Sequence, residues 1–194
     1  MSSPVEICSN ACILVGTSPI ASLSENSDRA IVMSNLYDQV RRATLRRHTW
    51  NFAMTRVLLS PDATAPAFEW TNKFTLPADC LRVCSIGELG EHPDYTLEGR
   101  AILSNDASIK LGYIKDETDA NVFDALYCDA LSANLAFTAA WPMTKNETLQ
   151  KSMYELYLLK IQEARTIDGV ETPPGEIDDS YILTARRSGG WPAN

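Results

Sequence analysis

Hydrophobic residues recur every three or four positions in two stretches near the start of the chain, and this spacing predicts two amphipathic helices. Ser3 and Glu6 have the spacing of a capping box, with Pro4 at the first helical position. The recurring residues of the first stretch are Val5, Cys8, Cys12 and Val15. The second stretch begins near Ser27 or Asp28 and ends around 47–49. Its apolar face consists of Met33, Leu36, Tyr37, Val40 and Thr44.

The pattern then changes to short runs of aromatic and β-branched residues, which are typical of strands. The segments Trp50–Leu59 and Phe68–Leu76 are separated by a proline-containing stretch, so we expect two strands joined by a long hairpin loop. Asn105–Asp106 is expected to be a tight turn between the last two strands. The further strands expected are Leu81–Ile86, Tyr95–Leu97, Ala101–Leu103 and Ile109–Ile114.

Helical spacing returns after Asp116 and predicts two more helices. Pro142 is expected to end the third helix. Thr144 and Glu147 form a second potential capping box, and the fourth helix is expected to last to about Thr166. The apolar face of the third helix consists of Phe123, Leu126, Tyr127, Ala130, Leu131, Asn134 and Phe137. That of the fourth consists of Leu149, Met153, Leu156, Tyr157 and Ile161.

This order of elements predicts an α+β fold. The expected organisation is a four-helix bundle from 1–49 and 116–166, a small antiparallel β-rich insert from 50–115, and an extended C-terminal arm from 167–194. Glycines and prolines interrupt the arm too closely for a long element, yet it is too apolar to be a solvated tail. We expect it to order against a surface, and favour a neighbouring molecule over its own body. The candidate anchors are Tyr181, Ile182, Leu183 and Trp191.

Composition narrows the classes of function. The net charge of −8 argues against a protein that wraps DNA, because such binding relies on a basic surface, but it permits DNA to pass without adhesion. The chain lacks an apolar run of about 18 residues and a signal peptide, so we expect neither a membrane span nor secretion. Synthesis in a reducing cytosol would keep the five cysteines reduced.

Candidate catalytic chemistry is sparse. His48 and His92 are interpreted as surface residues, since neither is paired with a nucleophile in a recognisable pattern. Cys8 with Cys12, and Cys80 with Cys84, could together bind zinc, but thiols on an amphipathic face are more often core residues. We therefore expect no cofactor, no metal and no enzymatic activity. The alternative left open is a small cysteine- or zinc-dependent enzyme.

Charge is distributed unevenly along the chain. Basic residues gather at the end of the second helix, and acidic residues gather between 88 and 129. Each group could be a solvated face, and the acidic cluster before the third helix also suits a helix N-terminus. Alternatively, the basic end of one copy packs against the acidic side of the next. The candidate inter-subunit residues are Arg41, Arg42, Arg46, Arg47, Asp116, Glu117 and Asp119.

Several strings, in their order along the chain, resemble the tail tubular protein A family. These proteins are the adaptors, or head-to-tail connectors, of short-tailed bacteriophages. The strings are Val15-Gly16 followed by Pro19-Ile20, Arg47-His48-Thr49-Trp50-Asn51-Phe52-Ala53, Leu76-Pro77-Ala78-Asp79-Cys80-Leu81-Arg82-Val83, Asn121-Val122-Phe123-Asp124-Ala125-Leu126, and Arg186-Arg187.

The resemblance implies a structural protein of the virion tail that forms a ring, expected to be a dodecamer, beneath the portal. It also implies that this ring extends the DNA ejection channel and supports the nozzle, a tail tubular protein B-like partner, and possibly the tail fibres. In such a ring the helical bundle and the arm, including Arg186 and Arg187, face the portal, and 50–113 faces the nozzle. A head-completion connector of a long-tailed phage is the alternative in the same class.

Overall fold

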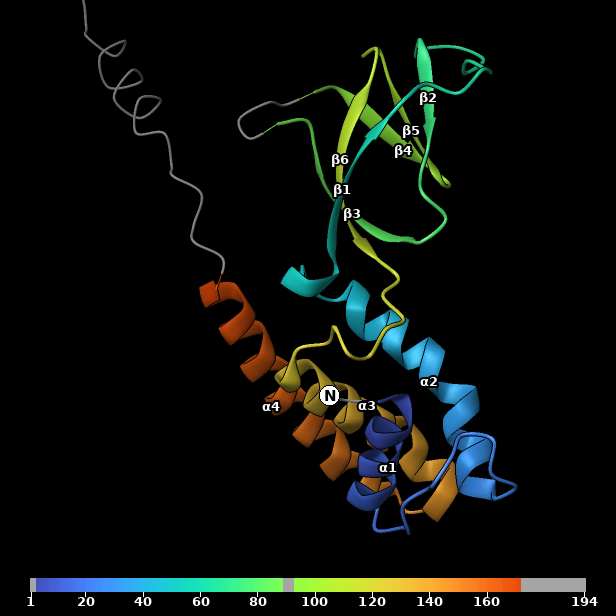
Figure 1. Cartoon of the computed structure of the whole chain (residues 1–194), viewed down its shortest axis with the longest axis vertical. Coiled ribbons are helices and arrows are strands. Elements are labelled where there is room, and N and C mark those ends of the chain that lie inside the picture. The colour runs from blue at the N-terminus through green and yellow to red at the C-terminus, as the bar shows by residue number, and fades with distance from the viewer. Residues whose placement is uncertain (1–2, 89–92, 172–194) are drawn as a thin grey trace, which may run out of the picture.

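The computed structural model describes residues 3–88 and 93–171. Within these residues the fold is α+β, as expected, with four helices and two three-stranded antiparallel sheets between the second and third helix (Figure 1). The helices are α1 (Pro4–Leu14), α2 (Asp28–Arg46), α3 (Ala125–Thr144) and α4 (Glu147–Glu171), with a short 3-10 helix, η1 (Asn51–Ala53). The strands are β1 (Met54–Leu59), β2 (Asn72–Thr75), β3 (Cys80–Ile86), β4 (Tyr95–Glu98), β5 (Ala101–Ser104) and β6 (Ile109–Lys115).

The helical body, made of α1 to α4, is built around α3. This helix packs against α1, α2 and α4, and it is buried on nearly every side rather than on the single face expected. Small residues such as Ala133 and Ala136 allow the close approach of its neighbours. Two buried polar side chains are satisfied across helices, because Ser132 donates to the Ile7 carbonyl (3.2 Å) and Asn134 to Thr44 Oγ1 (2.9 Å).

The helix ends confirm some expectations and correct others. Ser3 accepts the Glu6 N–H (3.1 Å) as the α1 cap. Pro142 does not end α3: near the C-terminus it removes only one backbone hydrogen bond, and the helix continues to a left-handed cap at Lys145. The capping box at Thr144 is also wrong, because Asn146 directly precedes the first residue of α4 and its side chain accepts the Leu149 N–H (3.1 Å).

The β-insert, β1 to β6, consists of two sheets rather than one. Sheet A has the order β1-β6-β3 and sheet B the order β2-β5-β4. The expected hairpin between the first two strands is wrong, since β1 pairs with β6 and β2 with β5. The turn at 105–106 likewise connects strands of different sheets. The two sheets share a small core of Phe74, Cys80, Ile86, Ile102, Ile109, Leu111 and Tyr113.

The segment between α2 and β1 belongs to the helical body, although the sequence placed it in the insert. Trp50 is fully buried in the core of the body, donates to the Thr44 carbonyl (3.2 Å), and packs edge-on against Tyr127. The fourth helix continues to Glu171, five residues beyond the expected end, and its last turn lies beside η1 (Figure 1). None of the helices in the described residues is long and apolar enough to cross a membrane.

Candidate interaction site

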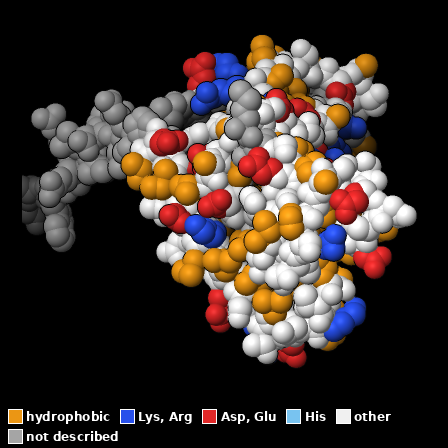
Figure 2. Space-filling model, turned by 60° about the horizontal axis from the view of Figure 1, so that its bottom comes forward, with side chains coloured by type: hydrophobic (Ala, Val, Ile, Leu, Met, Phe, Trp, Pro, Cys, Tyr) orange, Lys and Arg blue, Asp and Glu red, His pale blue; other side chains and the backbone are white. Residues whose placement is uncertain are grey.

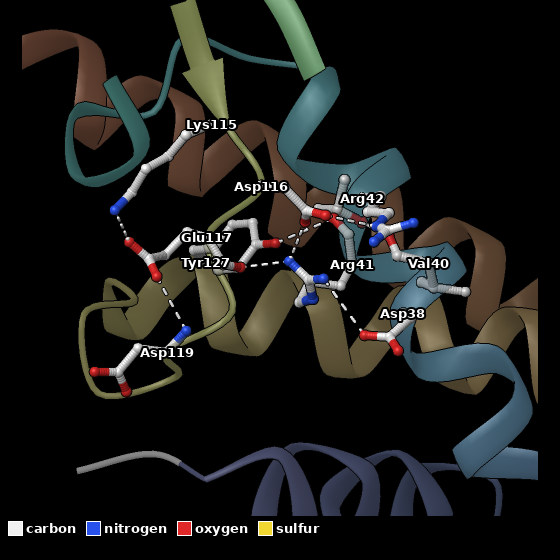
Figure 3. Close-up of polar contacts among 10 residues, drawn as sticks. Asp38, Val40, Arg41, Arg42, Lys115, Asp116, Glu117, Asp119 and Tyr127 are labelled. Atoms are coloured by element: carbon white, nitrogen blue, oxygen red, sulfur yellow. Dashed lines mark hydrogen bonds and ion pairs between the residues drawn. The ribbon is translucent and has the colours of Figure 1, made fainter. Parts of the chain in front are cut away.

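The structure brings Arg41, Arg42 and Asp116 together within a single chain, at the junction of the helical body and the β-insert (Figure 3). Asp116 directly follows β6 and accepts from Arg41 Nη1 (2.6 Å) and from Arg42 Nε (2.7 Å). The two basic residues therefore already have an acidic partner in one copy. An additional role for them between subunits stays a prediction.

Arg41 is the most deeply buried member of this charge cluster, with 1% of its surface exposed. Besides Asp116, its guanidinium donates to the Glu117 carbonyl and approaches Asp38 (3.4 Å). The hydroxyl of Tyr127 donates to the Arg41 carbonyl (3.3 Å). Because a buried cation is tolerated only with partners, these contacts fix the end of β6 against α2.

Glu117 and its neighbours extend the cluster along the chain towards α3 (Figure 3). Glu117 pairs with Lys115 (2.6 Å) and accepts the Asp119 N–H (3.0 Å). Burial, the largest single influence, raises the pKa of Glu117. The hydrogen bonds from Lys115 and the Asp119 N–H, the charge of Lys115 and the Thr118 N–H together outweigh it, so the pKa lies below its ordinary value. Asp119 accepts from Asn121 twice (3.0 and 2.8 Å), which lowers the pKa of Asp119.

Arg46 and Arg47 lie beyond this cluster and make different contacts. Arg46 donates to the Leu81 carbonyl in β3, and Arg82 donates back to the Arg46 carbonyl (3.1 Å). Arg47 donates to the Tyr157 hydroxyl (2.8 Å), with its guanidinium carbon 5.4 Å from the centre of that ring. One arginine thus connects α2 to the insert, and the next connects it to α4.

Asp168 is a site residue that sequence reasoning missed. It is buried in α4, where it pairs with His48 Nε2 (3.0 Å) and accepts the Asn51 N–H (3.0 Å). Its carbonyl accepts from the Asn51 side chain (2.9 Å). His48 is therefore a half-buried, paired residue and not the surface histidine expected, while His92 lies outside the described residues. We call His48, Asn51 and Asp168 the α4 anchor.

The cysteines are divided between the helical body and the β-insert. Cys8, Cys12, Cys80 and Cys128 are buried, as expected, and Cys84 is half-buried. Burial raises the pKa of Cys8 to about 12, so this thiol stays neutral. Cys8 and Cys12 lie in the core of the body, whereas Cys80 lies in that of the insert. In residues 3–88 and 93–171 no three His, Cys, Asp or Glu side chains gather to hold a metal ion.

The helical end of the molecule carries several hydrophobic patches (Figure 2). One lies over a groove of about 280 Å³ between α1, α3 and α4, lined by Ile13, Leu14 and Leu156. Leu159, on the outer face of α4, is also exposed. Apolar patches on a monomer commonly mark a surface that a partner covers.

The predicted anchors of the arm lie outside the described residues. They are Tyr181, Ile182, Leu183, Arg186, Arg187 and Trp191. Their proposed contacts with a portal stay predictions.

No protein-family model matches this chain, and a search of curated proteins finds no significant match. The resemblance to the adaptor family therefore rests on the strings described above.

Proposed function

We propose that this chain is a structural virion protein of a short-tailed bacteriophage: a ring-forming adaptor that joins the portal to the tail nozzle and extends the DNA ejection channel. The observation that supports this most is the position of the string 47–53. It contains Arg47, two members of the α4 anchor and the buried Trp50, so it joins α2, α4 and the insert.

Two other strings of the resemblance also occupy places that determine the fold. In 76–83, Asp79 accepts from Tyr113 (3.2 Å), and its carbonyl accepts the Asp116 N–H (2.7 Å). In 121–126, Asp124 caps α3 by accepting the N–H groups of Leu126 (2.8 Å) and Tyr127 (3.2 Å). These strings therefore supply caps and junctions of the fold, and this use of them supports the proposal.

Surface properties are consistent with an assembly subunit. The exposed apolar patches of the helical body would be covered by a partner. The net charge of −8 would repel the phosphates of DNA, which suits a channel through which DNA passes without specific binding. In this proposal the helical body and the arm face the portal, and the β-insert faces the nozzle and possibly the tail fibres.

Deletion of residues 172–194 tests the portal contact. The deletion starts at 172 because residues up to 171 belong to α4, and Asp168 holds His48 and Asn51. We expect the truncated protein to keep its circular dichroism spectrum and melting temperature but to stop co-sedimenting with the portal of the same phage.

A full-length variant provides the matched control. Tyr181→Ala, Ile182→Ala and Leu183→Ala together should reproduce most of the loss if these side chains are the anchors. If the truncated protein still co-sediments with the portal, the assignment of the arm is wrong.

A further inference from the structure

The outer face of sheet A contains a large hollow, which we call the outer cavity. Its volume is about 990 Å³, within the usual range of ligand pockets. Among its lining residues, Arg56 and Leu58 come from β1, Gly112 from β6 and Tyr95 from β4. Leu58 and Tyr95 are exposed, so the cavity offers an apolar surface to solvent.

Gly112 and the side chain of Ser85 occupy the centre of this face. Arg56 is paired with Gly112 in the ladder, and Leu58 with Lys110, so these four positions lie on one face. A Cβ at Gly112 would come within 2.4 Å of Ser85 Oγ, which leaves no room for a side chain there. The group that approaches the glycine backbone closely is Ser85 itself, so only a small side chain rises from the centre of the face.

Among the described residues that line the cavity, one positively charged side chain is available to pair with an incoming group. Lys110 is paired with Glu88. The side chain of Arg56 is exposed, and its guanidinium has no hydrogen bond or ion pair within residues 3–88 and 93–171. The cavity therefore suits an apolar group that is accompanied by a negative charge.

A matching group protrudes from the loop that connects sheet A to sheet B. Phe68 is 78% exposed in the connection between β1 and β2, and Glu69 follows it. Glu69 has a φ of 71°, a left-handed conformation that is uncommon for residues other than glycine, and the Trp70 N–H donates to the Phe68 carbonyl (2.8 Å). We call residues 66–70 the Phe68 loop.

The Phe68 loop and the outer cavity lie on opposite sides of the β-insert. The loop borders Lys73, Ala101 and Leu103 of sheet B, whereas the cavity lies on sheet A. Lys73 and Leu103 are strand neighbours of the core residues Phe74 and Ile102, so the loop lies on the face of sheet B that points away from the core shared by the two sheets. Two complementary surfaces on opposite sides allow each copy to bind the next in the same way, and such a contact can close into a ring.

We propose that the Phe68 loop of one copy inserts into the outer cavity of the next. Phe68 packs against Leu58 and Tyr95, and the Glu69 carboxylate pairs with Arg56. The aromatic side chain supplies the buried anchor of the contact, and the ion pair sets its orientation. The proposal that these contacts close into a ring rests on the proposed adaptor function, whereas the contact itself does not.

Disulfide cross-linking tests the contact with the full chain. The variant carries Leu58→Cys and Ala67→Cys in a Cys84→Ser background, because Cys84 also lines the cavity and Phe68 has to remain as the anchor. Mild oxidation should give a ladder of cross-linked species on a non-reducing gel, and neither single cysteine should. The matched control replaces Leu58→Cys by Lys151→Cys, a highly exposed position on α4. Absence of a ladder, or an equal ladder from the control, overturns the proposal.

Charge reversal provides a second test, read by light scattering at high protein concentration. Arg56→Glu and Glu69→Arg should each weaken self-association by about tenfold or more. A mixture of the two variants should associate again in alternating order, since both contacts between unlike variants pair opposite charges and only contacts between like variants repel. The variant with both changes should associate again. Single variants that associate like the original chain would overturn the contact.

The outcomes separate this contact from the adaptor function. A specific cross-link in a protein that never binds a portal would remove the adaptor function and leave the contact. Rings that form on a portal although the cross-link is absent would leave the adaptor function and remove the proposed contact.

Discussion

The helical body and the β-insert are built on different principles. The body buries an entire helix, α3, and its core continues through α1, α2, α4 and the Trp50 segment. The insert consists of short strands around a core of seven buried residues. Because a small sheet assembly has little apolar surface to bury, we expect the insert to depend on its attachment to the body for stability.

The β-insert is attached to the helical body by apolar packing and by an ion pair. Ile114, at the end of β6, is buried in the core of the body, and Met54 and Leu81 pack against the same core. Arg41 and Asp116 connect the two parts through a mostly buried ion pair. The helical body therefore contains most of the stabilising core and can act as the folding unit. The β-insert can accordingly present exposed features such as the Phe68 loop.

The largest expected effect on stability distinguishes the core of the helical body from the core of the β-insert. Trp50→Ala should lower the free energy of unfolding by about 3–5 kcal/mol, because it empties the centre of the body. Amide hydrogen exchange should then accelerate in both parts. Phe74→Ala, a fully buried aromatic in the insert, should accelerate exchange mainly in β1 to β6. Phe68→Ala is the control and should change stability by less than about 0.5 kcal/mol. Equal exchange patterns for the two buried variants would contradict the comparison.

The next largest effect on stability concerns the attachment of the β-insert to the helical body. Arg41→Ala should cost about 3 kcal/mol, because it leaves Asp116 with one partner at a mostly buried position. Arg42→Ala, which removes a side chain that is 57% exposed from the same carboxylate, should cost about 1 kcal/mol or less. Urea unfolding measures both values. If the two substitutions cost the same, Arg41 is not the residue that fixes the insert.

A smaller effect is expected at the end of α4. Asp168→Ala should cost about 1–2 kcal/mol, because His48 and the Asn51 N–H lose their partner. The amides of the last turn of α4 should lose exchange protection, while those of β1 to β6 keep theirs. Asp129→Ala, an exposed carboxylate on α3 that pairs with Lys160, is the control. Unchanged protection at 168–171 would show that the α4 anchor does not hold the helix end.

The smallest effect is a pH dependence at the junction. The pKa of Glu117 is lower in the folded state than its ordinary value of 4.5, so its stabilisation is present above that pH. The stabilisation is lost as the pH falls through the lowered pKa. Glu117→Gln should therefore flatten part of the acid limb of a stability profile recorded below pH 4.5. An acid limb unchanged by the substitution would contradict this contribution.

Local patterns predicted the helices and the positions of most strands, because the spacing of apolar residues and the Ser3 cap depend on nearby sequence. Strand pairing could not be predicted, since β1 and β6 are far apart and many partners suit short strands. The pairing of Arg41 with Asp116 was missed for the same reason. Asp168 had a detectable signal: it continues the buried spacing of Tyr157, Ile161 and Ala164.

Electron microscopy of the chain mixed with the portal of the same phage tests the adaptor proposal most directly. We predict a ring of copies stacked coaxially on one end of the portal, with the helical bodies against it and neighbouring β-inserts in contact. A chain that stays unattached to the portal, or that binds it only as scattered single copies, would contradict the proposal.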